Sequence, residues 1–436
     1  MTERNARIAV AIMLFIYVVA MRTYDIATTF LMLGEQTRDW TIALGGITGL
    51  PLTGAPSTAG GRGLGPVYYW LLWIGRVTIG PFMDNLPHAG GVFVALLQSI
   101  ADVWLFVALS RRIPWTLALA VCVLIASAPF DIALSSLIWN PPVAAAMIKM
   151  ATAMALSLTP ASPLWQVAVT AAFAWSAVQC HLSGIFVAAP LLAALAWTRR
   201  VKGAVTIAIT VAVLQMPFFL ALALDPSGPA GPTTAIASIT NPQAFRPLLA
   251  FGSVTGITAN LVYPLYDTFE YAIAVAAAAL ITVFAYRKDV VVIAVTAGAI
   301  MMATALFTTS TRAYDGYWFI TLTTALTLSF GMAIAAIPSK TAVTWIGVVL
   351  LVFVAWRQPS RIDESKKYFK YPQYGTMVRA SEDLIRKAPS VRDIRLTFEV
   401  HPTMDRFFIY RILGGEIAPA AMNTAVFNAD GSVRLE

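Results

Sequence analysis

Charged residues are scarce in this sequence. Asp, Glu, Lys and Arg make up 12% of its 436 residues, against about 25% in an ordinary soluble domain. Water does not keep so weakly charged a surface dispersed, whereas a lipid bilayer accommodates it. The hydrophobic residues, 58% of the chain, also come in long runs, which indicates membrane-spanning helices rather than one large soluble core. The strands of an outer-membrane barrel alternate polar and apolar residues instead, so that class is excluded.

Cysteine and histidine are scarce as well. The two cysteines, Cys122 and Cys180, lie in or beside apolar runs, which argues against a disulfide framework, and the CxxC spacing of a metal site is absent. The three histidines are scattered along the chain and do not make a zinc site. The net charge of +8 collects in short patches between apolar runs, which indicates membrane topology rather than nucleic-acid binding. The first apolar run has no small-residue cleavage site behind it, so we expect a retained helix and not a signal peptide.

A helix needs about 20 mostly apolar residues to cross a membrane. Eleven segments are candidates: residues 8–22, 89–109, 115–130, 143–158, 164–179, 181–198, 203–224, 268–286, 290–309, 317–337 and 341–356. The predicted fold class is therefore an all-α polytopic membrane protein with about 11 transmembrane helices.

Basic residues beside these segments predict their orientation, because cytoplasmic loops carry an excess of Lys and Arg. When the N-terminus is placed in the cytoplasm, alternation brings all the main basic patches to that side: Arg4 with Arg7, Arg111–Arg112, Arg199–Arg200 with Lys202, Arg287–Lys288, and Lys340. The agreement requires that residues 67–83 do not span. That segment is apolar and aromatic but carries Arg76, so we interpret it as an interfacial or re-entrant helix.

Three long segments then face the non-cytoplasmic side: residues 23–88, 225–266 and 357–436. The last has the composition of a soluble domain. It contains a helix-like MVRASEDLIRKA, a strand-like IRLTFEV, a second helix-like stretch near 403–413 and a final TAVFNADGSVRLE. We predict a membrane domain over residues 1–356 and a small α/β domain over residues 357–436.

The first outer segment contains a cluster of charges in the run GEQTRDW. Glu35 and Asp39 are four residues apart and share one face if the run is helical. A carboxylate can accept a proton from an attacking hydroxyl or bind a metal ion that assists this step. The guanidinium of Arg38 can hold a phosphate in bidentate fashion. The alternative is a solvated helix face with an ordinary ion pair, which this spacing allows equally well.

A glycine-rich stretch, GAPSTAGGRGLGP, follows in the same outer segment. Glycines let backbone amides approach an anion closely, and Arg62 within the stretch is a candidate ligand of the same phosphate. The GK[ST] of a P-loop does not follow. A flexible loop over the bilayer is the alternative reading.

Together these two stretches resemble the first outer loop of bacterial C-type (GT-C) glycosyltransferases of the dolichyl-phosphate-mannose mannosyltransferase-like group. The pattern there is an acidic residue, then QARD, then GPxSSxGGxxLGPLYYYL. SSLIWNPPV, with Asn140, resembles the WNP motif of the same enzymes, and VQCHLSG, with Gln179 and His181, resembles their QxH motif. The likeness covers roughly residues 8–200.

The resemblance implies eleven to thirteen spanning helices, a catalytic acidic residue in the first outer loop, a lipid-phosphate-linked sugar donor and inversion of the anomeric centre. Glu35 takes the place of the leading acidic residue, where Asp is commoner, and Asp39 that of the Asp in QARD. Thr37 replaces the Ala of that motif. Neither departure removes a carboxylate, and a divalent cation (Mg or Mn) held by Glu35 and Asp39 stays open.

Several other residues are candidates for contacts with the substrates. His181, Lys149, Arg246 and Arg312 could bind the donor phosphate, and Tyr68, Tyr69, Asn140 and Gln179 could line the substrate site. Each also has a structural reading. Ionisable residues inside predicted spans, such as Lys149 and Asp102, often pair with each other. An arginine can pair with a nearby carboxylate, as Arg312 with Asp315, and aromatic residues form membrane belts.

We therefore expect an inverting glycosyltransferase that moves a sugar from a polyprenyl-phosphate donor to a hydroxyl of a glycan, lipid or protein acceptor. The resemblance places it in a bacterial inner membrane, with a cytoplasmic N-terminus and a periplasmic active site and C-terminal domain. Glu35 is the expected base and Asp39 the second carboxylate. A transporter or flippase of a lipid-linked substrate is the alternative, although the sequence lacks the internal repeat common among transporters.

Overall fold

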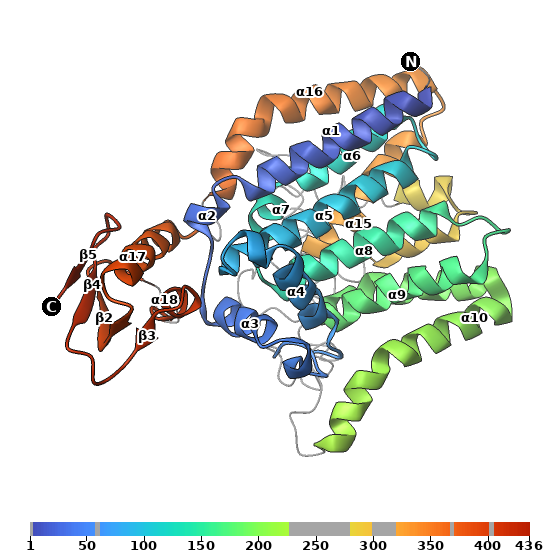
Figure 1. Ribbon diagram of the computed structural model, residues 1–436. Helices are drawn as coiled ribbons and strands as arrows, with labels where there is room; N and C mark the ends of the chain where they lie inside the picture. The colour runs from blue at the N-terminus through green and yellow to red at the C-terminus, as the bar shows by residue number, and fades with distance from the viewer. Residues whose placement is uncertain (1–2, 57–61, 226–279, 299–319, 367–369, 401–404) are drawn as a thin grey trace, which may run out of the picture.

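The computed structural model describes residues 3–56, 62–225, 280–298, 320–366, 370–400 and 405–436. These residues form a bundle of long apolar helices with a small α/β unit at one end, beside α2 (Figure 1). The N-terminus lies at the opposite end of the bundle (Figure 1).

The chain begins with α1 (Glu3–Thr23), and the short helix α2 (Ile26–Thr29) follows it directly. The first outer segment continues with α3 (Gly34–Leu44) and α4 (Val67–Thr78). At 1.5 Å per residue α4 is about 18 Å long, too short to cross a hydrocarbon core of about 30 Å. Its length agrees with the interpretation of residues 67–83 as a segment that does not span.

The central bundle consists of α5 (Pro87–Leu109), α6 (Trp115–Ala126), α7 (Pro129–Leu134), α8 (Asn140–Ser157), α9 (Leu164–Cys180) and α10 (Ile185–Leu224). The prediction of one continuous helix over residues 115–130 is wrong, because α6 ends at Ala126 and α7 starts at Pro129. Proline has no amide hydrogen to continue the helix and suits the first turn of a new one.

A backbone break divides α10. Arg200 has φ 53° and ψ −151° inside this 40-residue helix, so residues 185–199 and 201–224 are separate segments. They match the two predicted segments 181–198 and 203–224. Figure 1 shows the change of direction, and the second segment still contacts the end of α9, because Gln179 donates to the backbone oxygen of Leu214.

The later helices are α15 (Ile320–Ala335) and α16 (Lys340–Ser365), and residues 280–285 and 290–298 are also helical. Helix is thus present in the described part of all eleven predicted segments. By length and hydropathy, four helices of the described chain are clear candidate spans: Arg4–Thr29, Pro87–Leu109, Leu182–Leu224 and Lys340–Asp363. The count of about eleven therefore stays a prediction.

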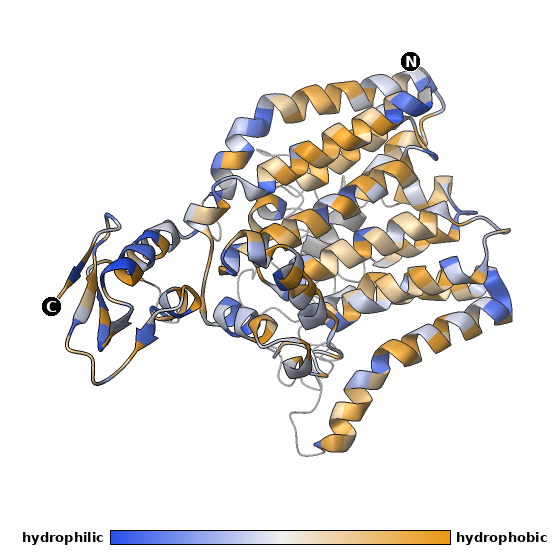
Figure 2. Cartoon of the chain, in the orientation of Figure 1, coloured by the Kyte–Doolittle hydropathy of each residue, from blue (hydrophilic) through white to orange (hydrophobic). Residues whose placement is uncertain are grey.

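Apolar residues predominate along the helices of the bundle (Figure 2), and several of the large ones are exposed. On α16, Trp345, Val349, Val352 and Trp356 are 63–69% exposed, and their spacing places them on one side of the helix. A water-facing helix would carry polar residues on that side, so this stripe is suited to lipid.

The C-terminal unit contains α17 (Gln373–Lys387), α18 (Phe408–Ile412) and two small sheets. In one sheet β2 (Asp393–Leu396) runs parallel to β4 (Thr424–Phe427), and β4 pairs antiparallel with β5 (Val433–Leu435). In the other, β1 (Ser390–Val391) runs parallel to β3 (Glu416–Ile417). The unit thus has the α/β composition predicted from its sequence, whereas α16 extends beyond residue 356 into the predicted tail domain.

The C-terminal unit packs against the first outer segment through α17 and α2. The ring of Tyr374 lies against Phe30, with ring centroids 5.4 Å apart, and its hydroxyl is hydrogen-bonded to His88 Nδ1 at 2.9 Å. Gly375 lies so close to α2 that an added Cβ would be 2.8 Å from the Cα of Thr28. A backbone atom cannot move aside as a side chain can, so only glycine fits here.

We expect Gly375→Ala to separate α17 from α2, because the added methyl group overlaps with the backbone of Thr28. Limited trypsin digestion measures this as faster cleavage at the half-buried Lys370. Gly49→Ala is the matched control, since no atom lies within 4 Å of a Cβ built there. Unchanged digestion of Gly375→Ala would show that the contact is not tight.

Candidate functional site

The helix α3 holds the charged cluster of the first outer segment. It begins after Leu33, whose backbone N–H donates to Oε1 of Gln36 at 3.0 Å. Trp40 is fully buried, and its Nε1 donates to the backbone oxygen of Asn85 at 2.7 Å. The helix is therefore fixed on one side against the start of α5, while Glu35 in its first turn is exposed.

Asp39 is buried under the side chains of α4. Its carboxylate accepts hydrogen bonds from the hydroxyls of Tyr68 at 2.9 Å and Tyr69 at 3.1 Å, and from Nε of Arg38 at 2.8 Å. Burial raises the pKa of Asp39 above its ordinary value, although the Arg38 guanidinium and both hydroxyls oppose that shift. The result is a carboxylate whose two oxygens are occupied by protein donors.

Arg38 lies between this buried carboxylate and solvent. Its side chain is 36% exposed while that of Asp39 is 1% exposed, and the carboxylate keeps the pKa of the guanidinium above its usual value against the opposing effect of burial. A guanidinium that remains charged, with its stem held by Asp39, can present its outer nitrogens to an anion. Glu35 precedes it by three residues, so the two side chains are neighbours on the helix surface.

The glycine-rich stretch packs on the QxH motif. An added Cβ at Gly65 would be 2.3 Å from the side-chain amide of Gln179, and one at Gly63 would be 3.3 Å from its backbone oxygen. The amide of Gln179 donates to the backbone oxygen of Leu214 at 2.6 Å, and Gln215 donates to that of Leu64 at 2.5 Å. The second segment of α10 therefore joins the two motifs.

The WNP motif contacts the QxH motif directly. Asn140, at the start of α8, donates from Nδ2 to the backbone oxygen of Cys180 at 2.9 Å. His181, which follows Cys180, is hydrogen-bonded through Nδ1 to the hydroxyl of Ser183 at 2.6 Å. Four stretches that are distant in sequence are thus connected, from Asp39 through the tyrosines and glycines to Gln179 and Asn140.

The structure places the remaining predicted residues as follows. Arg62 pairs with Pro56 in an isolated antiparallel bridge of the glycine-rich stretch. Arg246 and Arg312 lie outside the described residues. Tyr68 and Tyr69 contact Asp39, and Asn140 and Gln179 contact backbone, so substrate contacts by these four side chains stay predictions.

The predicted cation site at Glu35 and Asp39 does not fit the geometry of these two residues. Asp39 directs both oxygens at hydrogen-bond donors, and Glu35 is exposed one turn away. Within the described ranges, no group of three or more His, Cys, Asp and Glu residues could hold a metal ion.

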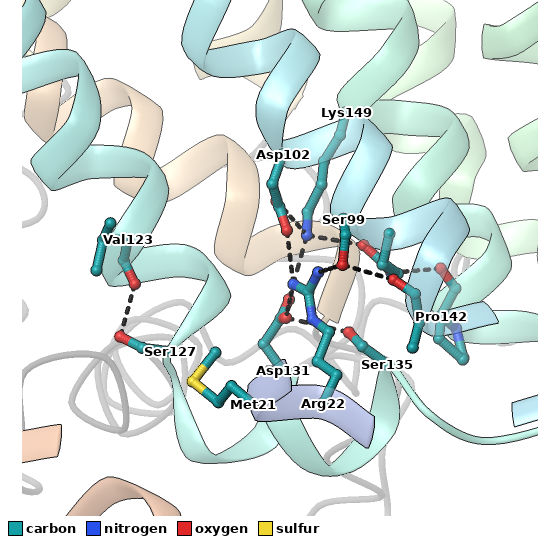
Figure 3. Close-up of polar contacts among 12 residues, drawn as sticks. Met21, Arg22, Ser99, Asp102, Val123, Ser127, Asp131, Ser135, Pro142 and Lys149 are labelled. Atoms are coloured by element: carbon teal, nitrogen blue, oxygen red, sulfur yellow. Dashed lines mark hydrogen bonds and ion pairs between the residues drawn. The ribbon is translucent and has the colours of Figure 1, made fainter. Parts of the chain in front are cut away.

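Lys149 lies in a buried network of two cations and two anions (Figure 3). Its ammonium is 2.8 Å from Asp102 and 3.3 Å from Asp131. The guanidinium of Arg22 is 2.6 Å from Asp102 and 2.5 Å from Asp131. All four side chains are at most 2% exposed. The alternative stated for Asp102, a pair with Lys149, is confirmed.

The network joins α1, α5, α7 and α8, because each helix contributes one of its charges. Ionisable residues in a membrane bundle face its interior and pair there, and these four charges sum to zero. Removing one member would leave a buried charge without compensation. Phosphate binding by Lys149 stays a prediction, while its observed contacts are structural.

Three residues that fix the helices around the site were missed from the sequence. Arg22 and Asp131 lie at helix ends, where single charges are common, and Gln215 is one polar residue in an apolar helix. A polar side chain inside an otherwise apolar span was the available indication for Gln215.

Known structures share the fold of this chain, whereas no family model and no curated protein matches its sequence. ArnT from Cupriavidus metallidurans, bound to undecaprenyl phosphate, superposes with a TM-score of 0.56 and 14% identity over 93% of this chain and 84% of ArnT. The oligosaccharyltransferase AglB from Archaeoglobus fulgidus, in complex with an inhibitory peptide and a dolichol-phosphate, gives 0.52 and 11% over 96% of this chain and 65% of AglB.

The same Archaeoglobus enzyme, in complex with zinc and sulfate, gives a TM-score of 0.52 at 11% identity over 94% of this chain and 62% of the enzyme. The chain therefore shares its fold with ArnT and with this oligosaccharyltransferase. The narrower resemblance to the mannosyltransferase-like group stays a prediction.

We expect Gly65→Ala to destabilise the protein, because its methyl group displaces the amide of Gln179 and breaks the hydrogen bond to Leu214. A lost buried hydrogen bond costs about 1–3 kcal/mol. In a double-mutant cycle measured by thermal unfolding, Gly65→Ala should cost less when Gln179→Ala is already present. Equal costs in both backgrounds would exclude the contact as the cause.

We expect Lys149→Met to lower stability by about 3–5 kcal/mol, as breaking a buried ion pair does. Adding Asp102→Asn removes the excess negative charge and should restore part of the loss. Thermal unfolding of the purified protein measures both variants, and Lys202→Met, at an exposed lysine, is the control. Strictly additive losses would contradict a coupled network.

Proposed function

We propose that this protein is an inverting glycosyltransferase that moves a sugar from a polyprenyl-phosphate donor to an acceptor hydroxyl on the non-cytoplasmic face of the membrane. The observation that carries the proposal is the chain of contacts that links Asp39, beside Glu35 and Arg38, through α4 and the glycine-rich stretch to Gln179 and Asn140. The fold supports it, because ArnT and AglB have been seen with a polyprenyl or dolichyl phosphate bound.

The base in this proposal is Glu35. It is the exposed carboxylate of α3, so an acceptor hydroxyl can approach it, whereas both oxygens of Asp39 accept hydrogen bonds from protein groups. Glu35 accepts the proton of the acceptor hydroxyl as its oxygen attacks the anomeric carbon. Asp39 is then a positioning residue, which fixes α3 to α4 and orients Arg38.

The leaving group in this proposal is the polyprenyl phosphate. The bond between the anomeric carbon and the phosphate oxygen breaks, and the phosphate takes the electron pair. Because a phosphate is already a good leaving group, it needs charge stabilisation rather than a proton, and the partly exposed guanidinium of Arg38 supplies it. Arg246, Arg312, Arg62 and His181 are further candidates for this role.

The mechanism predicts inversion. The acceptor oxygen enters opposite the departing phosphate, so a single displacement reverses the configuration of the anomeric carbon. A retaining enzyme would instead need a second displacement through a covalent intermediate. The site places one exposed carboxylate on α3, which suits the single step.

We expect Glu35→Gln to abolish transfer and to leave the fold intact, because the exposed side chain loses its basicity but keeps its size. The assay supplies labelled undecaprenyl-phosphate sugars and an extract of envelope glycolipids and polysaccharides. It measures both released undecaprenyl phosphate and label on the extract.

Glu382→Gln, an exposed carboxylate of the C-terminal unit, should transfer like the wild type. Normal turnover by Glu35→Gln would rule out Glu35 as the base. If wild-type protein relocates the intact donor between leaflets of a vesicle without releasing undecaprenyl phosphate, the protein is a transporter and the proposed reaction is wrong.

A further inference from the structure

The side chain of Gln215 lies at the junction of α9, the second segment of α10 and the glycine-rich stretch. It is 7% exposed, in a part of α10 that is otherwise apolar. Its Nε2 donates to the backbone oxygen of Leu64 at 2.5 Å, and its Oε1 accepts from Nε1 of Trp175 at 2.9 Å. One buried amide therefore ties the stretch to α9.

The two partners require opposite roles from this side chain. An indole N–H can only donate a hydrogen bond, and a backbone carbonyl can only accept one. A carboxamide meets both requirements at once, whereas an ionised glutamate cannot donate, a lysine cannot accept and an aliphatic side chain does neither. The glutamine is thus matched to its two contacts, and Trp175 determines which end of the amide faces Leu64.

A second glutamine strengthens the junction. Nε2 of Gln179 donates to the backbone oxygen of Leu214 at 2.6 Å and lies 3.5 Å from Oε1 of Gln215. An added Cβ at Gly65 would be 2.3 Å from the Gln179 amide, so the stretch lies directly on it. Because the backbone break at Arg200 separates the two segments of α10, these contacts set where the second segment meets the stretch.

Leu64 is close in sequence to residues of the proposed site. Arg62, a candidate ligand of the donor phosphate, precedes it by two residues, and Tyr68, which donates to Asp39 at 2.9 Å, follows it by four. A hydrogen bond to the backbone of Leu64 therefore limits the freedom of both neighbours. A glycine-rich backbone loses much conformational freedom when it is fixed, so holding it before the donor arrives lowers the entropic cost of binding.

We propose that Gln215 is a positioning residue for the donor. Its amide holds the backbone of the glycine-rich stretch in the conformation that receives the donor phosphate. This role rests on the proposed function, and it assigns part of donor binding to a buried residue of α10 that acts through Leu64 rather than by touching the donor.

Steady-state transfer by Gln215→Met, measured against increasing concentrations of the labelled undecaprenyl-phosphate sugar, tests this role. Methionine keeps the length of glutamine and suits an apolar helix, but it has no N–H to donate. We expect the KM for the donor to rise about tenfold, the effect of about one hydrogen bond. The kcat should stay within about twofold of wild type, because the lost contact acts on donor binding alone.

Gln215→Glu, which keeps an acceptor for Trp175 but loses the amide donor to Leu64, should raise the KM as well. Gln166→Met, at the start of α9, is the matched control and should leave both kinetic constants unchanged.

Trypsin cleavage after Arg62 is the second measurement, and it does not require transfer. Gln215→Met should be cut there faster than the wild type and Gln166→Met, while cleavage after the exposed Lys366 keeps its rate. If wild-type protein transfers no sugar, the proposed function fails, and the cleavage rate still tests the contact with Leu64. An unchanged KM in Gln215→Met, a decrease in kcat alone, or cleavage after Arg62 at the wild-type rate would overturn the positioning role and leave the proposed function standing.

Discussion

The buried carboxylate of Asp39 is the interaction on which the outer site depends. Its two oxygens accept from residues of both α3 and α4, and these two short helices are too short to be anchored by crossing the bilayer. Burying a carboxylate without hydrogen-bond donors costs free energy. The packing of α3 on α4 therefore requires these hydrogen bonds, and the hydrogen bonds require the packing. Arg38 is held by the same group and reaches solvent from it.

The glycines extend this arrangement from the surface into the bundle. A side chain at Gly65 would overlap with that of Gln179, and one at Gly63 would lie tightly against its backbone oxygen, so the absence of side chains lets the outer stretch lie directly on the end of α9. Hydrogen bonds from Gln179, Gln215 and Asn140 to backbone oxygens then fix the surrounding helix ends. Polar side chains of the long helices therefore hold the backbone around the site in place. Hydrogen bonds of this kind keep the reacting groups of a site in position.

The sequence predicted the parts of this structure that depend on local pattern. The helix α17 and the strand β2 follow from spacing and composition, whereas a helix at Glu35 and Asp39 was only a condition for the two carboxylates to share a face. The opposite exposure of Glu35 and Asp39 could not be predicted, because both share one face and only the tyrosines of α4 distinguish them. Arg22 and Asp131 were missed for a similar reason: each is an ordinary residue at a helix end until distant segments bring four charges together.

The charge network has an electrical consequence. Moving one elementary charge across the full thickness of a membrane changes its electrostatic energy by about 2.3 kcal/mol per 100 mV of membrane potential. Arg22 and Lys149 are matched by Asp102 and Asp131 at contact distance, so the forces of the field on the four groups nearly cancel. Helices α1, α5, α7 and α8 can therefore carry four ionised groups in their core without being pulled toward either surface when the cell changes its membrane voltage.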